Sequence, residues 1–481
     1  MIAPISKHTT DRVVIGICGA GNMGLGIAQV AAKAGASTIV YDNSPAATAQ
    51  AAERLSGSLE QQVAAGRMSP EQADSVLSLV SWTNRLKDLA EVELVIEAII
   101  EREDVKTELF QSLESIVSES AILATNTSSL SVSALAAKLI HPGRFMGLHF
   151  FNPATRMKLV EVVCGLLTDP ALSQGASDMM RQWGKSPVPA KDVPGFIVNR
   201  VARPFYAEGW RAYEEGVATA AEIDHAFRAI GHYRMGPLEL GDLIGHDINF
   251  SSAEKIYNAY FGRTRFHPSV SQALLVGAGM LGQKSGAGVY RYGKGETQAQ
   301  PSFRNGANQA PEQLAKILES PPGKLVSYDG VAVGWSFGPS ASALAERQKS
   351  PVVLLDHSGN SAGAGCLAAM SSDAAARKKI EALADRPIVH LADRAGGLVF
   401  RTQCQLANSA ADAIRDFVAS ADEIDEAMLL GVNYPVGPIS WARQAGFGRV
   451  CTALDAIADE TGEGLYRPSE VLRKLAREQK V

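Results

Sequence analysis

Short apolar runs alternate with amphipathic stretches over the first third of the chain. The apolar runs predict buried strands at residues 13–18, 37–42, 94–98, 122–126 and 144–149, and a helix follows the first of them, through Ala34. Strands separated by helical segments are typical of a doubly wound, parallel sheet. We therefore expect an α/β domain over residues 11–190.

The pattern changes after about Pro187. Apolar residues recur at helical spacing from Gly195 to about Ala278, which predicts an all-α domain over residues 191–292. Residues 293–312 are polar and rich in Gln, Asn and Gly, as is typical of a linker. Strand-like runs at 330–334, 351–356 and 387–391, with a helix at 341–347, then predict a reduced α/β unit over 313–391.

The C-terminal segment repeats the first helical domain at an offset of 201 residues. The repeat predicts a second, degenerate helical domain over residues 392–481. Its Phe400 stands where the first copy has Asn199, so we expect no catalytic role for the second copy. The matching segments are Asp192–Arg200 with Asp393–Arg401, Glu222–Asp224 with Glu423–Asp425, and Gly236-Pro237 with Gly437-Pro438.

Composition and charge narrow the class of protein. The 481 residues carry a net charge of −5, which argues against a nucleic-acid partner. The first residues are polar, which argues against a secretion signal, and no apolar run reaches about 18 residues, which argues against a membrane-spanning helix. We therefore expect a cytoplasmic protein without a membrane partner. The five cysteines are scattered without a C-x-x-C pair, so we expect neither a disulfide framework nor a metal site.

A glycine loop, Gly19-Ala20-Gly21-Asn22-Met23-Gly24, joins the first predicted strand to its helix. Gly19 permits the tight turn, Gly21 lets a pyrophosphate approach the backbone, and Gly24 allows close packing of helix on strand. Asp42 ends the next strand, where a carboxylate can accept both ribose hydroxyls and would repel a 2′-phosphate. Strand, loop, helix and acid together predict a Rossmann domain that binds NAD. A chance glycine turn is the less favoured alternative.

The second α/β unit has no such loop. Its Gly334–Gly338 segment lacks the G-x-G-x-x-G pattern, although Asp356 occupies a strand end as a ribose-binding acid would. We therefore expect a reduced Rossmann-like unit without a nucleotide.

His149 and Glu161 are the candidate catalytic pair. A lone histidine is more often a buried core residue, but a carboxylate in the apolar run 159–163 is costly unless a partner holds it. A histidine oriented by a carboxylate can take the proton of a hydroxyl group near neutral pH. These residues indicate an NAD-dependent oxidoreductase. The alternatives are a dehydrogenase with a catalytic lysine and a non-catalytic NADH-binding protein.

Residues 11–292 closely resemble the 3-hydroxyacyl-CoA dehydrogenases. The resemblance implies that His149 is the base, that Glu161 orients it, and that Ser128 and Asn199 position the substrate oxygens. It also implies that NAD is contacted by Ser128 and by Gly19, Gly21, Asn22, Met23, Gly24, Asp42, Glu101, Lys106, Asn152 and Lys284. The matching segments are the glycine loop with Asp42, Glu97–Lys106, Asn126–Ser129, His149–Pro153, Met157–Glu161, Pro194–Arg200 and Gly282–Gly286.

The same resemblance implies the reaction and its substrate, an (S)-3-hydroxyacyl-CoA that becomes the 3-oxoacyl-CoA. The long bacterial members, with a second helical copy, imply 3-hydroxyadipyl-CoA of phenylacetate degradation, with 3-hydroxybutyryl-CoA as the alternative. An adipyl carboxylate calls for a cation. Arg234 and Arg203 are candidates by position, although solvation at the surface is the favoured role for both. Arg54 and Arg67 are the cations available to coenzyme A between residues 53 and 68.

The tandem helical copies also bear on assembly. Short family members commonly dimerise through the helical domain, so a second copy in one chain predicts an internal pseudo-dimer. A homodimer of the whole chain stays open.

Overall fold

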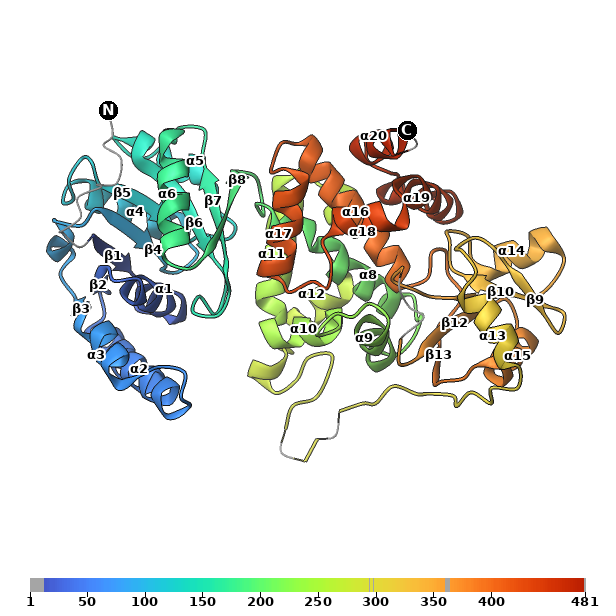
Figure 1. Ribbon diagram of the computed structural model, residues 1–481. Coiled ribbons are helices and arrows are strands. Elements are labelled where there is room, and N and C mark those ends of the chain that lie inside the picture. The colour runs from blue at the N-terminus through green and yellow to red at the C-terminus, as the bar shows by residue number, and fades with distance from the viewer. Residues whose placement is uncertain (1–12, 294, 297, 360–363, 480–481) are drawn as a thin grey trace. The chain divides into compact units, whose positions relative to one another are not determined.

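The computed structural model describes residues 13–293, 295–296, 298–359 and 364–479 (Figure 1). The chain forms two compact units that meet in sequence between Ile197 and Val198. Within them, the limits predicted for the individual domains stay predictions. No helix of the described residues is long and apolar enough to cross a membrane.

The first unit is built on one eight-stranded sheet. Its strands lie in the order β3-β2-β1-β4-β5-β6-β7-β8, and neighbours are parallel except β6 and β7, which are antiparallel. The doubly wound α/β fold is confirmed, but the prediction of a wholly parallel sheet is wrong at this pair. The strands are β1 (Val14–Cys18), β2 (Ser37–Tyr41), β3 (Val80–Thr83), β4 (Leu94–Glu97), β5 (Ile122–Thr125), β6 (Phe145–Phe150), β7 (Leu159–Cys164) and β8 (Ser186–Lys191).

The hydrophobic pattern does not predict three of these strands, β3, β7 and β8, and each omission has a physical reason. β3 is only four residues long. β7 is buried along nearly its whole length, so it reads as a continuous apolar run without alternation. β8 contains Pro187 and Pro189, which an edge strand tolerates because it pairs on one side only.

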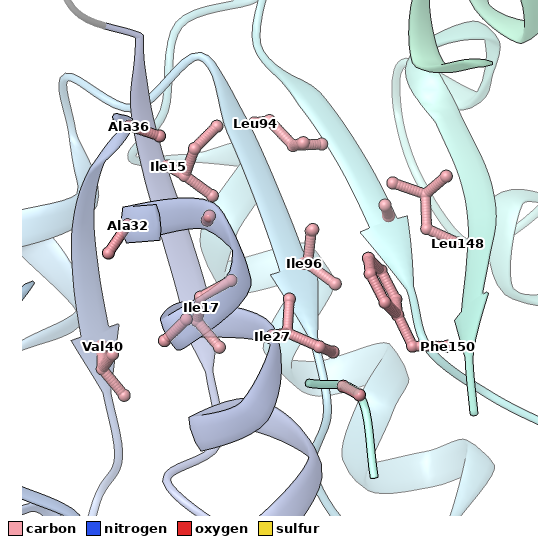
Figure 2. Packing of buried hydrophobic residues seen from close by; sticks show 14 of the residues in the cluster. Ile15, Ile17, Ile27, Ala32, Ala36, Val40, Leu94, Ile96, Leu148 and Phe150 are labelled. Carbon is pink, nitrogen blue, oxygen red and sulfur yellow. The ribbon is translucent and has the colours of Figure 1, made fainter. Parts of the chain in front are cut away.

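Helix α1 packs its apolar face on the sheet and forms the core beneath the glycine loop. Figure 2 shows Ile27 of α1 beside Ile17 of β1 and Ile96 of β4, and all three side chains are fully buried. Burying one such side chain contributes about 1.5–3 kcal/mol, so this layer fixes where the carboxyl ends of the strands lie. The helices of this unit are α1 (Asn22–Lys33), α2 (Pro45–Ala64), α3 (Pro70–Ser78), α4 (Glu103–Glu114), α5 (Val132–Ala136) and α6 (Ala171–Gln182).

The two helical copies of the second unit repeat each other down to single hydrogen bonds. Thr219 and Glu222 form a capping box at α9, and Ser420 and Glu423 form the same box at α17. The repeat is therefore confirmed. The first copy holds α7 (Val198–Val201), α8 (Arg203–Glu214), α9 (Ala220–Ala229), α10 (Pro237–Ile244), α11 (His246–Ala259) and α12 (Val270–Gly277), and the second α16 (Val399–Arg415), α17 (Ala421–Gly431), α18 (Pro438–Ala445), α19 (Phe447–Thr461) and α20 (Glu470–Glu478).

A buried aspartate joins two helices in the same way in both copies. Asp224 accepts hydrogen bonds from the backbone N–H groups of Leu238 and Glu239 at the start of α10. Asp425 accepts the corresponding bonds from Ile439 and Ser440 at the start of α18. The residue before each of these helices, Gly236 or Gly437, must be a glycine, because a side chain there would overlap the aspartate.

The remaining part of the second unit is a five-stranded sheet in the order β13-β12-β11-β10-β9. From β10 to β13 the pairs run parallel, antiparallel, parallel, as they do from β5 to β8 in the first unit. The reduced Rossmann-like unit thus repeats only the second half of the first sheet. Its elements are α13 (Pro311–Leu318), β9 (Val326–Tyr328), β10 (Val331–Trp335), α14 (Ala341–Gln348), β11 (Val352–Leu355), β12 (Leu367–Ser371), α15 (Ala374–Leu383) and β13 (Ile388–His390), of which β9 and β12 escape the hydrophobic pattern.

Candidate active site

The glycine loop has the backbone geometry that a pyrophosphate requires. Gly19 has φ +109°, and a Cβ there would lie 2.6 Å from the carbonyl oxygen of Ala98. A Cβ on Gly24 would lie 1.9 Å from the carbonyl oxygen of Gly19, so helix and strand can approach only through this glycine. Gly21 has nothing within 4 Å of its Cβ position, and it caps α1 without a side chain. The first N–H groups of a helix, here those of Asn22 and Met23, have no partner within the helix, which fits a dinucleotide phosphate at this loop.

Asp42 lies beside this loop at the end of β2. Its Oδ2 accepts a hydrogen bond from the N–H of Ala20 at 2.9 Å, and its Oδ1 accepts one from Ser44 at 3.0 Å. These bonds hold the carboxylate beside the glycine loop, and its predicted contact with the ribose stays a prediction. Arg54 of α2 donates to Asn22 Oδ1 at 2.8 Å and to the carbonyl oxygen of Ala20 at 2.9 Å. Arg54 is thereby placed at the glycine loop, which its position in the sequence did not indicate.

Glu101 organises the loop that follows β5. Its Oε1 accepts hydrogen bonds from Thr127 Oγ1 at 2.7 Å, from the N–H of Ser128 at 3.0 Å and from Ser129 Oγ at 2.9 Å. Burial raises the pKa of this carboxyl, but Lys106 and the donors of the loop outweigh that effect and hold the pKa at about 2. The charged carboxylate therefore fixes Ser128.

Lys106 is almost wholly buried and forms ion pairs with Glu97 and Glu101. The side chain of Thr125 also donates to Glu97, which ties the end of β5 to the same group. The direct contacts of Lys106 are with these two carboxylates, and its predicted contact with NAD stays a prediction.

His149 and Glu161 form the pair that the sequence suggests. His149 Nδ1 lies 2.6 Å from Glu161 Oε2, and the two residues are directly opposite each other on β6 and β7. Glu161 Oε1 accepts a hydrogen bond from the N–H of Ile197 at 3.0 Å. The rings of Phe151 and Phe196 lie against the imidazole, at centroid distances of 4.5 and 5.8 Å. Because Nδ1 is held by the carboxylate, Nε2 is the nitrogen that remains available to take a proton.

The end of β6 is also held from β5. Asn126 Oδ1 accepts a hydrogen bond from the N–H of Phe150 at 2.8 Å. Beyond Phe150 the backbone passes through Asn152, whose side chain is exposed, and Lys185 donates to the carbonyl oxygens of Ala154 and Met157. These bonds fix the segment that follows His149, and the role of Asn152 toward NAD stays a prediction.

Asn199 and Lys284 belong to the second unit. Asn199 is half-buried on α7, and its carbonyl oxygen accepts a hydrogen bond from Arg203 Nε at 2.8 Å. Lys284 forms an ion pair with Asp247 at 2.5 Å. Their roles toward substrate and cofactor stay predictions.

The second α/β unit carries an altered counterpart of the pair. Asp356, fully buried, accepts hydrogen bonds from the N–H groups of Leu398, Val399 and Phe400. Leu398 is the repeat partner of Ile197. Asp356 therefore accepts the backbone N–H at the start of the second copy, as Glu161 accepts that of Ile197 at the start of the first. The ring of His357 stacks on Phe400 at 4.5 Å. A carboxylate with these partners is a backbone cap and not a ribose-binding acid.

The glycine loop, Asp42 and His149 lie at the carboxyl ends of β1, β2 and β6, where open α/β sheets bind their ligands, and Glu161 faces His149 from the antiparallel strand β7. A glycine loop, an acid after the second strand and a histidine–carboxylate pair at this edge define the class of protein as a nucleotide-dependent dehydrogenase. Among the residues that the structure describes, no group of three or more His, Cys, Asp or Glu side chains could hold a metal ion.

Two family descriptions match the chain. "3-Hydroxyacyl-CoA dehydrogenase, NAD binding domain" matches residues 14–193. "3-Hydroxyacyl-CoA dehydrogenase, C-terminal domain" matches residues 195–292 and again 396–481, the two helical copies. The chain belongs to the 3-hydroxyacyl-CoA dehydrogenase family, and it is an enzyme with NAD as its cofactor.

Individual relatives agree with this assignment. 3-Hydroxyadipyl-CoA dehydrogenase of Escherichia coli (strain K12) is 40% identical over 465 residues, which are 96% of this chain and 97% of the relative. 3-Hydroxybutyryl-CoA dehydrogenase of Mycobacterium tuberculosis (strain ATCC 25618 / H37Rv) is 39% identical over 280 residues, which are 58% of this chain and 98% of the relative. A crystal structure of 3-hydroxybutyryl-CoA dehydrogenase from Escherichia coli K12 substr. MG1655 superposes with a TM-score of 0.90 at 38% identity, and covers 98% of this chain and 99% of its own.

Proposed function

We propose that this chain oxidises the 3-hydroxyl group of an (S)-3-hydroxyacyl-CoA to the 3-oxoacyl-CoA, with His149 as the base. The observation that carries the proposal is the buried His149–Glu161 pair at the strand-end edge that also holds the glycine loop. Bound NAD supplies the acceptor for the hydride that leaves C3. The residues of the chain bind and orient the substrate and remove the proton of its hydroxyl group.

His149 Nε2 accepts the proton of the 3-hydroxyl group. Glu161 holds Nδ1 protonated and stabilises the positive charge that the imidazole gains. The burial of Glu161 strengthens this effect, because a charge interaction is stronger away from water. Ser128, fixed by Glu101, donates a hydrogen bond to a substrate oxygen, and Asn199 does the same from the helical domain.

For the acyl chain we propose the dicarboxylic substrate 3-hydroxyadipyl-CoA of phenylacetate catabolism. The likeness to 3-hydroxyadipyl-CoA dehydrogenase over nearly the full length of both chains supports this choice. 3-Hydroxybutyryl-CoA is the second candidate, since the full-length solved structure is described as acting on it.

The absorbance of NADH during turnover of both thioesters in parallel decides between them. A higher kcat/KM for the adipyl thioester supports the first candidate and a higher value for the butyryl thioester the second. Lack of turnover with both would refute the proposed activity. A cytoplasmic location stays a prediction from the sequence.

We further propose that the two helical copies form an internal pseudo-dimer. Corresponding arginines support this arrangement, because each reaches an acid of the other copy. Arg200 pairs with Asp416, and its repeat partner Arg401 has Nε 3.0 Å from Glu208 Oε2. Arg394 of the second copy lies 3.0 Å from Glu215, which is the repeat partner of Asp416.

Sedimentation equilibrium tests this arrangement. The pseudo-dimer predicts that the first helical domain is already covered, so the chain does not dimerise through that domain. A tight dimer disrupted by substitutions on that domain's surface would contradict it.

A further inference from the structure

Arg54 of α2 binds the glycine loop on both sides of Gly21. Its Nη1 donates a hydrogen bond to Asn22 Oδ1 at 2.8 Å, and its Nη2 donates one to the carbonyl oxygen of Ala20 at 2.9 Å. These partners lie 32 and 34 residues away in the sequence. Within the part of the chain that the structure describes, no carboxylate forms an ion pair with Arg54. The guanidinium therefore has the loop, and not an acid, as its partner.

The buried face of α2 determines where Arg54 lies. Ala51, Leu55 and Leu59 follow one another at intervals of four residues, are 1% exposed or less, and belong to the core of the first unit. Side chains at this spacing share one face of a helix, so the core fixes the rotation of α2. Arg54 is exposed next to Leu55, at the edge of that face. Because the core holds the helix in place, the fold does not depend on Arg54.

Side chains fix Ala20 through both of its peptide groups. Asp42 accepts a hydrogen bond from the N–H of Ala20 at 2.9 Å, and Arg54 donates one to the carbonyl oxygen of the same residue. That carbonyl and the N–H of Gly21 belong to one planar trans peptide group, in which the two point in opposite directions. Arg54 therefore also sets the direction of the Gly21 N–H.

The turn at Gly21 has little else to order it. Nothing lies within 4 Å of the Cβ position of Gly21, and no side chain caps the start of α1. Glycine loses more conformational freedom on becoming ordered than any other residue. A turn that is ordered beforehand does not lose this freedom when a phosphate binds, so the binding is tighter. A restraint from outside the loop, such as Arg54 provides, thus favours the bound state.

We propose that Arg54 is a positioning residue of the NAD site, which orders the turn at Gly21 for the pyrophosphate of the cofactor. Arg54 then serves NAD and not the phosphates of coenzyme A, for which its position in the sequence makes it a candidate. Arg67, the other candidate cation of this stretch, is exposed beyond the end of α2. The role of Arg54 concerns NAD alone, so its failure would leave the proposed reaction of His149 intact.

The test compares the dissociation constants of NADH and of coenzyme A, from titration calorimetry, in the wild type, Arg54→Met, Arg54→Lys and the control Arg67→Met. Arg54→Met is expected to weaken NADH binding roughly 3- to 10-fold, through the loss of the two hydrogen bonds, and to leave coenzyme A binding unchanged. Arg54→Lys keeps the charge but not the planar group that holds both acceptors, so its NADH affinity should stay close to that of Arg54→Met. Arg67→Met should bind both ligands as the wild type does.

Hydrogen exchange of the protein without cofactor gives a second measurement. The amides of residues 20–23 should exchange faster in Arg54→Met than in the wild type, while those of α4 keep their wild-type rates. Unchanged exchange in the loop, or unchanged NADH affinity, would overturn the role of Arg54. Full NADH affinity in Arg54→Lys would overturn it too, because charge and not the ordered turn would then be the cause. Faster exchange throughout the first unit would show a general structural role in its place.

Discussion

His149 and Glu161 are register partners on two adjacent antiparallel strands, and the imidazole and carboxylate meet at 2.6 Å. Residues opposite each other in such a ladder project their side chains from the same face. The pair is therefore set by the β6–β7 register, and a slip of one residue would turn one of the two side chains to the other face. This antiparallel pair is also where the sheet departs from the parallel pattern.

Glu161→Gln should lower kcat by roughly 10² to 10⁴ while the protein stays folded. An amide can present its NH₂ group to Nδ1, which then becomes the acceptor and leaves the proton on Nε2. In that tautomer Nε2 cannot take the substrate proton. Steady-state NADH formation measures the effect, and circular dichroism checks the fold. A kcat within twofold of the wild type would show that Glu161 does not orient the base.

Gly24→Ala should abolish NAD binding or weaken it strongly, because its Cβ would overlap the carbonyl oxygen of Gly19. Gly57→Ala is the matched control, since it lies inside α2 with nothing within 4 Å of its Cβ position. The control should bind NAD normally and gain about 0.5–1 kcal/mol in stability. Titration calorimetry with NAD compares the two variants. Equal affinities would contradict the tight glycine contact.

Glu208 should make the second unit sensitive to acid. Burial raises the pKa of this carboxyl, but Arg401, Arg211 and Arg394 outweigh it and hold the pKa at about 2. The folded state thus binds this proton less readily than the unfolded state, whose pKa is near 4.5. The stabilisation is present above about pH 4.5 and is lost as the pH falls toward 2.

The comparison of Glu208→Gln with the wild type measures this contribution. The difference in free energy of unfolding should be about 3 kcal/mol at pH 7 and should shrink below about pH 4.5. Denaturant titrations at several pH values give the two curves. Glu346→Gln, at an exposed position of α14, serves as the control and should follow the wild type. A difference that does not change between pH 7 and 3 would show that Glu208 does not act through its charge.

Part of this site can be predicted from the sequence because local rules determine it. The glycine loop must follow a strand and open a helix, and Asp42 must end the next strand, so order along the chain fixes their neighbourhood. The link between His149 and Glu161 follows from the cost of a buried carboxylate. The register that joins them does not, since β7 is a continuous apolar run in which periodicity does not mark a strand.

Tertiary packing decides the features that the sequence does not indicate. Arg203 and Arg234 look alike in the sequence, yet one is buried and the other is exposed. Arg54 reaches the glycine loop only because α2 folds back on it. The offset of 201 residues predicts the second helical copy. The likeness of β10–β13 to β5–β8 cannot be predicted in this way, because it lies in the directions of the strands and not in matching residues.

The central claim is that His149 removes the proton of a 3-hydroxyl group as NAD is reduced. Single-turnover NADH formation with (S)-3-hydroxyadipyl-CoA, in the wild type and in His149→Gln, tests it most directly. We expect NADH to form in one fast phase in the wild type, and the rate of that phase to be at least about 10² times slower in the variant. A variant that forms NADH at the wild-type rate would contradict the assignment of the base.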